Sequence, residues 1–306
     1  MNTYFYRLTF KTPVHFGQGR LSGSGSGIFA DTLFSALYIE ALGMGEADKL
    51  LALAKDGSLS LSDLFPFSGA ACFVPKPIMR IQTDKKGDSS LKKKFKGLTH
   101  IPVSDIDEYI GGDYDPDKAA EKLRGIGKST LRQSVRIVED SDNEPYSVGL
   151  FTFAEGCGLY FAASVSDETK QLLDRLMTAL SLAGIGGERS SGLGKFSFEC
   201  TEADESFKKR LNVGGKAMSL SVCLPTDNEL ETAMKNATFE TVKRSGFVGS
   251  ESYADTPLRK RDLYCFKAGS VFADRFAGDI FDVSTGEGRH PVYRYARPMW
   301  FSVDRG

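Results

Sequence analysis

Residues 169–200 read TKQLLDRLMTALSLA-GIGGERSSGLG-KFSFEC and contain three successive patterns. In the first, four leucines and Met177 recur at helical spacing, which predicts a helix over residues 169–183. The second pattern, residues 184–194, is a glycine-rich loop, and the third, residues 195–200, has the composition of a strand. A helix, a long glycine loop and a strand therefore follow each other directly.

The segments before this stretch extend the order of elements backwards along the chain. A strand is expected at residues 4–10, and a helix is expected to open at Asp31 and to end at Gly43. Strands at residues 146–153 and 159–165 are separated by a short turn, which predicts a hairpin. The resulting order, β-α-β-β-α-β, is typical of a ferredoxin-like or RRM-like unit and predicts an α+β fold.

The chain is long enough for two such domains. We assign residues 1–205 to the first domain and residues 212–306 to a second, degenerate copy, with a strand at 218–224 and a helix at 227–236. Residues 84–145 interrupt the first domain, because they are polar, blocked in charge and poor in sustained periodicity. This segment is predicted to be an insertion that projects from the core.

The formal net charge is −1, so the protein as a whole is not basic, and RNA binding would need local patches. Such patches exist, since residues 85–100 hold six lysines against one aspartate and residues 122–136 hold five cations without an acid. Between these patches, residues 101–121 carry seven carboxylates. Their sequence does not match the pattern of a calcium-binding loop, because Lys118 stands where such a loop needs glycine.

Further classes of protein are disfavoured by the composition. The five cysteines form no C-x-x-C pair, which argues against a disulfide framework and against a zinc site. No apolar stretch approaches the roughly 18 residues of a membrane span, so we expect a cytoplasmic protein. We also expect no metal and no other cofactor.

The glycine loop is the first candidate binding site. Glycines permit positive φ and close approach of a ligand, and exposed N–H groups suit a phosphate. The alternative is a flexible connection, but eleven residues exceed what a link from helix to strand requires. The candidate residues here are Gly186, Gly187, Arg189, Ser190, Ser191, Gly192 and Lys195.

Clustered cations are the second group of candidates, because lysine and arginine neutralise RNA phosphates. Phe95 lies within the first cluster and could stack on a base. The second cluster recurs every four residues, which would align its members on one face of a helix. The third cluster lies near Lys243 and Arg244 in sequence. The clusters are Lys92, Lys93, Lys94 and Lys96; Lys128, Arg132 and Arg136; and Arg259, Lys260 and Arg261.

The glycine pattern G-x-G-G-x-x-x-x-G-x-G after the second helix resembles the signature loop of the RAMP superfamily of CRISPR proteins. Other segments, spread over nearly the whole chain, resemble the subunit-four family of the type III-A Csm effector complex. These segments are residues 14–19, 30–37, 64–67, 74–77, 146–153, 245–248, 259–264 and 290–295.

The resemblance implies two ferredoxin-like domains, with residues 84–145 as a thumb inserted in the first. It implies a non-catalytic subunit that binds the 5′ repeat-derived tag of the guide RNA (crRNA) in antiviral defence. It also implies two protein partners, the large polymerase-like CRISPR subunit and the backbone RAMP subunit, and no cofactor.

The loop with His15, Gly17 and Gly19 is expected to meet the same RNA. A catalytic alternative exists, because repeat-processing members of the RAMP superfamily are metal-independent endoribonucleases that can use a histidine as general base. His15 lies in about the right region, and histidine titrates near neutral pH. No second proton donor is evident beside it in the sequence, so RNA contact is the favoured interpretation.

A third possibility is a structural adaptor that contacts only protein. Four aromatic residues near the C-terminus could form a partner interface, since such residues are enriched there. We expect most of them to belong to the core instead. They are Tyr293, Tyr295, Trp300 and Phe301.

Overall fold

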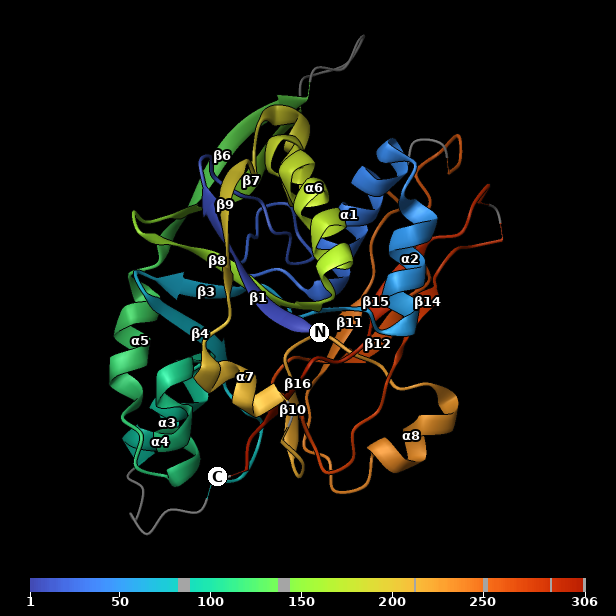
Figure 1. Cartoon of the computed structure of the whole chain (residues 1–306). Coiled ribbons are helices and arrows are strands. Elements are labelled where there is room, and N and C mark those ends of the chain that lie inside the picture. The colour runs from blue at the N-terminus through green and yellow to red at the C-terminus, as the bar shows by residue number, and fades with distance from the viewer. Residues whose placement is uncertain (82–88, 137–143, 212, 250–252, 287, 305–306) are drawn as a thin grey trace.

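The computed structural model describes residues 1–81, 89–136, 144–211, 213–249, 253–286 and 288–304. Its largest sheet has seven strands in the order β5-β4-β3-β8-β1-β9, and β2 pairs with β8 beside β3. Strands β4, β3, β8, β1 and β9 of this sheet are labelled in Figure 1. All the pairs in this sheet are antiparallel. The strands are β1 (Asn2–Phe10), β2 (Leu59–Leu61), β3 (Phe65–Ser68), β4 (Ala71–Pro75), β5 (His100–Pro102), β8 (Cys157–Val165) and β9 (Phe196–Glu202).

The helices that accompany this sheet begin and end close to the predicted positions. In chain order, β1, α1, β3, β8, α6 and β9 form a β-α-β-β-α-β succession, but its second strand is β3 and not the strand predicted at residues 146–153, which lies outside this sheet. The helices are α1 (Ala30–Met44), α2 (Ala47–Asp56), α3 (Ser89–Gly97), α4 (Ile106–Gly111), α5 (Pro116–Arg124), α6 (Asp167–Ala183), α7 (Glu205–Leu211) and α8 (Asp227–Ala233), with short 3₁₀ turns η1 (Val103–Asp105) and η2 (Arg189–Ser191).

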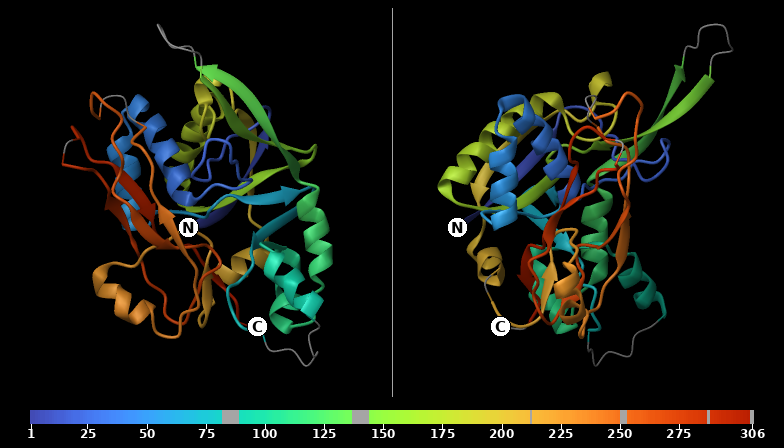
Figure 2. Two further views of the ribbon diagram at one scale, coloured as in Figure 1. Left: turned by 180° about the vertical axis from the view of Figure 1, so that it is seen from behind. Right: turned by 90° about the vertical axis from the view of Figure 1, so that its right-hand side faces the viewer.

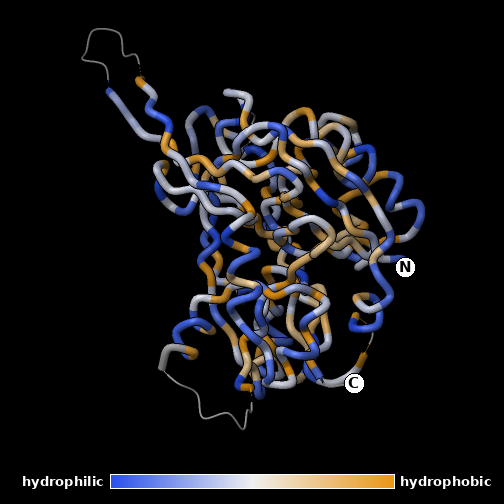
Figure 3. Tube along the Cα trace, turned by 90° about the vertical axis from the view of Figure 1, so that its left-hand side faces the viewer, coloured by the Kyte–Doolittle hydropathy of each residue, from blue (hydrophilic) through white to orange (hydrophobic). Residues whose placement is uncertain are grey.

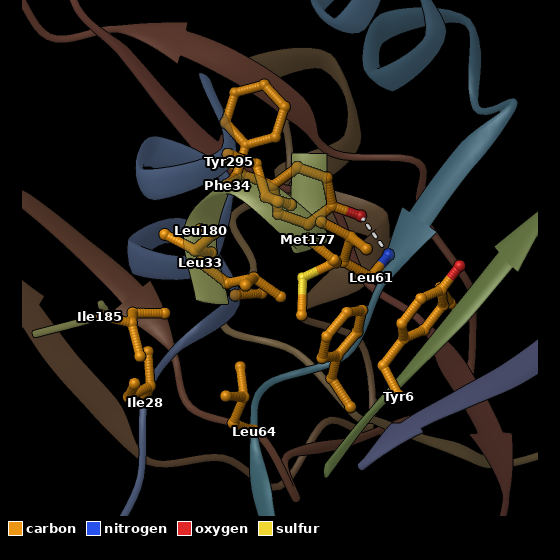
Figure 4. Close-up of a cluster of buried hydrophobic side chains, with 14 of the residues drawn as sticks. Tyr6, Ile28, Leu33, Phe34, Leu61, Leu64, Met177, Leu180, Ile185 and Tyr295 are labelled. Atoms are coloured by element: carbon orange, nitrogen blue, oxygen red, sulfur yellow. Dashed lines mark hydrogen bonds between the residues drawn. The ribbon is translucent and has the colours of Figure 1, made fainter. Parts of the chain in front are cut away.

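Both faces of the sheet are buried, so β8 is buried at every residue except Ser164 and does not alternate between apolar and polar residues. Leu159 and Phe161 pack into a core with α1 and α6, whereas Tyr160 and Ala162 face a second core on the opposite side. In the first core, the Leu61 backbone N–H donates a hydrogen bond to the Tyr295 hydroxyl at 3.0 Å (Figure 4). Hydrophobic segments accordingly concentrate inside the molecule (Figure 3).

The start of α1 differs from the prediction that Asp31 opens the helix. The N-cap position is Phe29, whose side chain makes no capping hydrogen bond, and Asp31 lies within the first turn. The Asp31 side chain is buried and binds two arginines from the C-terminal part of the chain. The Asp31 carboxylate therefore forms tertiary ion pairs, although the local sequence predicted that it would cap the helix.

The predicted insertion contains more regular structure than its weak periodicity suggested. Tyr109 and Ile110 of α4 and Ala119 of α5 are buried in the second core. Among the described residues, β6 (Gly127–Arg136) pairs with β7 (Glu144–Phe153) as a two-stranded ribbon whose outer part extends away from the rest of the chain (Figure 2). The helices of the insertion thus complete the core, and the ribbon is the part that projects.

The predicted hairpin between the strands around residues 146–153 and 159–165 is wrong in its pairing, although both strands exist. β7 pairs with β6 over ten residues, from Gly127–Phe153 to Arg136–Glu144. β8 instead has β1 on one edge, and β2 and β3 on the other. Because both edges of β8 are occupied by sheet partners, β7 binds the strand that precedes it in the chain.

The alignment of Lys128, Arg132 and Arg136 on a helix is also wrong, because all three lie on strand β6. Residues four apart share one face of a strand, as they do on a helix, but they are spaced by roughly 13 Å instead of roughly 6 Å. The reason is the pairing with β7, which a single sequence segment does not reveal.

The C-terminal part forms three small sheets, in the pairings β13-β10-β16, β11-β12 and β14-β15. The strand expected at 218–224 is limited to three residues, and the helix expected at 227–236 is shorter. Tyr295 and Phe301 are fully buried, which confirms that the C-terminal aromatics contribute to the core. The strands are β10 (Ala217–Ser219), β11 (Thr241–Arg244), β12 (Leu263–Phe266), β13 (Val271–Phe272), β14 (Asp279–Asp282), β15 (Tyr293–Ala296) and β16 (Trp300–Ser302).

Candidate nucleic-acid interface

A groove of about 730 Å³ lies where the loop after β1, the start of α1, the ends of β4 and α3, the glycine loop and the segment around β11 meet. Its wall combines backbone of several glycines with many cations. Six cationic side chains and two carboxylates line it: Lys76, Lys96, Arg189, Arg244, Lys260 and Lys267, and Asp63 and Glu240. The groove is therefore cationic in a protein whose net charge is −1.

The glycine loop packs closely against the loop after β1. The Gly187 N–H donates to the His15 carbonyl at 2.9 Å, and the Gly194 N–H donates to the Pro13 carbonyl at 3.0 Å. Gly186 has a φ of +105°, and a Cβ atom there would lie 2.8 Å from the His15 carbonyl oxygen. Contact between the two loops thus requires glycine at position 186.

His15 is 7% exposed and its ring is held in one orientation. Its Nδ1 lies 2.7 Å from the Gly149 carbonyl oxygen, which can only accept a hydrogen bond, so Nδ1 carries the proton. Gly17 and Gly187 lie beside the other edge of the ring. The histidine therefore joins β7, the glycine loop and the loop after β1 at one end of the groove.

The structure brings together some of the predicted binding residues and separates the others. The groove is lined by His15, Gly17, Lys96, Gly186, Gly187, Arg189 and Lys260. Outside its lining lie Gly19, Lys92, Lys93, Lys94, Lys128, Arg132, Ser190, Ser191, Gly192, Lys195, Arg259 and Arg261. The side chain of Arg136 and the whole of Lys85 and Lys86 are outside the described residues.

Two of the cations outside the groove bind carboxylates. Lys94 Nζ lies 2.7 Å from Asp117 Oδ2, which ties α3 to α5. Arg132 lies 3.7 Å from Glu188, which brings the ribbon to the glycine loop. The charge blocks of the sequence are thus partly paired with each other in space.

The expectation that Phe95 offers a face for stacking on a base is not supported by its packing. Phe95 packs against the second core, with its ring 6.3 Å from that of Tyr109. In α3 the neighbouring lysines point outward, and the aromatic side chain covers the apolar residues of α4. Burial of apolar area against the core determines its orientation.

Sequence reasoning did not single out several residues of the groove. Lys76 and Phe247 occur in segments that carried the family resemblance, and Arg244 was noted only as a neighbour of a cation cluster. Lys267 and Asp63 had no local signal at all. Their convergence depends on the packing of the C-terminal part against the first sheet.

A buried ion cluster supports the wall of the groove beside α1. Asp31 is 2% exposed and accepts hydrogen bonds from Arg244 Nε and Nη2, each at 2.9 Å, and from Arg294 Nη1. Burial alone would raise the pKa of Asp31, but attraction by Arg244 and Arg294 outweighs it and holds the pKa below its usual value. Asp31 is therefore ionised and joins α1 to β11 and β15.

Asp63 is a second buried carboxylate and lines the groove. Burial raises its pKa to about 7, although its Oδ1 accepts hydrogen bonds from the Ala30 N–H at 2.7 Å and the Val222 N–H at 2.9 Å. Desolvation dominates because, among the described residues, no cation forms an ion pair with Asp63 as Arg244 does with Asp31. Asp63 thus connects the start of α1 to the C-terminal part.

Within the described ranges of the chain, no group of three or more histidine, cysteine, aspartate or glutamate side chains is arranged to hold a metal ion. Nor does any of their helices have the length and apolarity needed to cross a membrane.

Comparison with known proteins establishes the family. The chain is 41% identical over 304 residues to the CRISPR system Cms protein Csm4 of Mycobacterium tuberculosis, covering 99% of this chain and 98% of that protein. The chain belongs to the Csm4 family. The family described as the CRISPR Csm4 C-terminal domain matches residues 212–303.

Solved structures of Csm4 proteins share the fold. The Csm3-Csm4 subcomplex of a type III-A CRISPR-Cas interference complex gives a TM-score of 0.68 at 17% identity, over 98% of this chain and 99% of that one. A Csm1-Csm4 cassette in complex with cA4 gives a TM-score of 0.63 at 17% identity, over the full length of both chains. The resemblance seen in the sequence to the subunit-four family of type III-A complexes is thereby confirmed.

Proposed function

We propose that this Csm4-family chain is the non-catalytic subunit that binds the 5′ tag of the guide RNA in a type III-A effector complex in the cytoplasm. The observation that carries the proposal is the groove, which gathers cations from segments far apart in the chain, including Lys76, Lys96 and Lys267. Phosphate contacts with these cations would supply most of the affinity, and contacts with unstacked bases would set the register.

The geometry of His15 supports a binding role in preference to catalysis. Its Nδ1–H donates a hydrogen bond to the Gly149 carbonyl. Its ring is almost entirely buried between the glycine loop and the loop after β1. A general base needs access to the proton that it removes. We therefore propose that His15 orders the loops which face the RNA.

The proposal extends to the architecture and to the partners. The strand order β3-β8-β1-β9, with α1 and α6 between strands in the chain, supports a ferredoxin-like first domain, and the β6-β7 ribbon supports a thumb. The related Csm4 proteins have been solved with Csm3 and with Csm1. We propose that this chain likewise joins the large polymerase-like subunit to the backbone RAMP subunits.

The test is binding of the purified chain to 5′-tag RNA and to a scrambled RNA across a salt series. The double variant Lys76→Glu/Lys96→Glu should bind tag RNA more weakly, and the slope of log K against log salt should become shallower by about 1.4, since each phosphate that is no longer neutralised accounts for roughly 0.7. The matched control is Lys209→Glu/Lys235→Glu, whose lysines are exposed and lie outside the groove lining.

Each alternative function has its own signature in this assay. Cleavage of repeat RNA without metal, lost in His15→Ala, would replace the proposal with an endoribonuclease. Failure to bind RNA, alone and together with the partner subunits, would leave a protein adaptor. Equal weakening by the groove variant and by the control would show that the groove is not the RNA site.

A further inference from the structure

One end of the groove combines an ordered guanidinium, a lysine and an exposed aromatic ring. Arg244 ends β11, Phe247 follows three residues later, and Lys260 lies on the adjacent segment. The two segments are joined by a hydrogen bond of 2.9 Å from the Lys260 N–H to the Gly246 carbonyl and by a bridge between Phe247 and Arg259. Backbone pairing thus places these three side chains in one part of the groove wall.

The hydrogen bonds of Arg244 leave part of its guanidinium for a ligand. Nε and one N–H of Nη2 bind Asp31, and Nη2 also donates to Thr32 Oγ1 at 3.0 Å. The Cζ atom of the guanidinium lies over the Phe29 ring, 4.1 Å from its centre. In the described part of the chain Nη1 donates no hydrogen bond, so two N–H groups at the groove wall remain for an acceptor.

The charge of this cluster is unbalanced. Arg244 and Arg294 share the single carboxylate of Asp31, and the buried Nε of Arg294 has no hydrogen-bond partner among the described residues. Burial lowers the pKa of Lys260, and repulsion by Arg294 and Arg244 lowers it further against the attraction of Asp31. An anion at the wall would offset this excess of positive charge.

Phe247 is the aromatic side chain of the groove that is most open to solvent. It is 57% exposed, whereas Phe16 and Phe65, which also line the groove, are buried. The Arg259 guanidinium lies over the Phe247 ring, 5.1 Å from its centre, and more than half of the Phe247 side chain is still exposed. An exposed aromatic ring next to cations is the usual arrangement for stacking an unpaired base.

We infer that Arg244, Lys260 and Phe247 form a subsite for one nucleotide of single-stranded RNA, with its phosphate on the two cations and its base stacked on the exposed ring of Phe247. Asp31 is a positioning residue of this subsite, because it fixes the plane of the Arg244 guanidinium and does not contact the nucleotide. The inference rests on the proposed function and assigns one position within the groove.

Phosphate contact and base stacking respond differently to salt, which provides the test. Arg244→Gln and Lys260→Gln should each weaken tag RNA binding about tenfold at moderate salt and make the salt slope shallower by about 0.7. Phe247→Leu should weaken binding roughly tenfold at every salt concentration without a change in slope. Phe247→Tyr should bind like the unmodified protein, because it keeps the aromatic face.

The control for the aromatic variant is Tyr264→Leu, since Tyr264 is 64% exposed and lies outside the groove lining. Thermal unfolding checks the fold of each variant. If Arg244→Gln destabilises the protein because it breaks the ion pair with Asp31, Lys260→Gln still tests the phosphate contact. The unmodified protein is expected to bind tag RNA with a steep salt slope. If Arg244→Gln, Lys260→Gln and Phe247→Leu all bind with the same affinity and slope as the unmodified protein, the subsite is wrong and the proposed function stands. A change of slope in Phe247→Leu would also refute the stacking assignment. Absence of RNA binding by the unmodified protein in its complex would overturn both.

Discussion

The N-terminal and C-terminal parts of this chain are stabilised in different ways. The first sheet contains long strands, such as β1 and β8, which pair over seven residues and bury both faces. The sheets after residue 213 contain strands of two to four residues. Many of the buried side chains of these short strands belong to cores that the first sheet and its helices build.

Specific polar contacts compensate for the short strands. Asp31 in α1 binds Arg244 of β11 and Arg294 of β15, and Asp63 accepts a hydrogen bond from the Val222 backbone. The C-terminal part therefore depends on the first sheet for its position, and the groove lies where the two parts meet. The ion pairs of Asp31 therefore join β11 and β15 to α1 beside the groove.

The largest effect is expected for Asp31→Ala, which would leave Arg244 and Arg294 buried without their carboxylate. Removal of one partner from a buried ion cluster costs about 3–5 kcal/mol in free energy of unfolding. Denaturant unfolding measures this loss, and amide exchange should rise more in β11 and β15 than in β1 and β8.

The control for that experiment is Asp48→Ala, an exposed acidic residue in the first turn of α2. Its effect should remain within about 0.5 kcal/mol. Equal acceleration of amide exchange in both parts of Asp31→Ala would contradict the dependence of the C-terminal part on this contact.

The next effect concerns the glycine loop and should be local to the N-terminal part. Gly194 has a φ of +75°, and an added Cβ would lie 2.1 Å from the Ile185 carbonyl oxygen, so Gly194→Ala should cost about 3 kcal/mol or more. Gly192 also has positive φ, but no atom lies within 4 Å of its Cβ position, so Gly192→Ala should cost about 1 kcal/mol. Thermal unfolding of the two variants measures these losses of stability. Equal losses would show that close packing around Gly194 does not contribute.

The last effect depends on pH and comes from Asp63. The folded pKa of about 7 exceeds the unfolded value of about 3.9, so the folded state binds more protons between these values. Stability from this group is therefore present below about pH 4 and decreases by up to about 1.4 kcal/mol per pH unit as pH rises to about 7. Asp63→Asn should remove this component from a series of denaturant unfolding curves. An unchanged pH profile would show that Asp63 stays ionised in the folded protein.

Much of the first sheet follows from sequence patterns. The leucine stripe of α6, the strand β1 and the glycine loop were predicted because helix and strand periodicity are local properties. Strand pairing is not a local property of the sequence. The pairing of β7 with β6, and the position of Lys128 on a strand, were therefore not predicted. The candidate site was predicted in outline, through His15, Lys96, Arg189 and Lys260, but not its boundaries.

The sequence by itself determined the family, the alternation of elements in the first sheet and the segregation of charge along the chain. Tertiary structure alone decided which cations share the groove, since Lys76 lies far along the chain from Arg244 and Lys267. It also decided that Asp31 is a buried ion-pair partner and not a helix cap. The physical reason is that burial and charge pairing depend on neighbours in space, which local propensity does not contain.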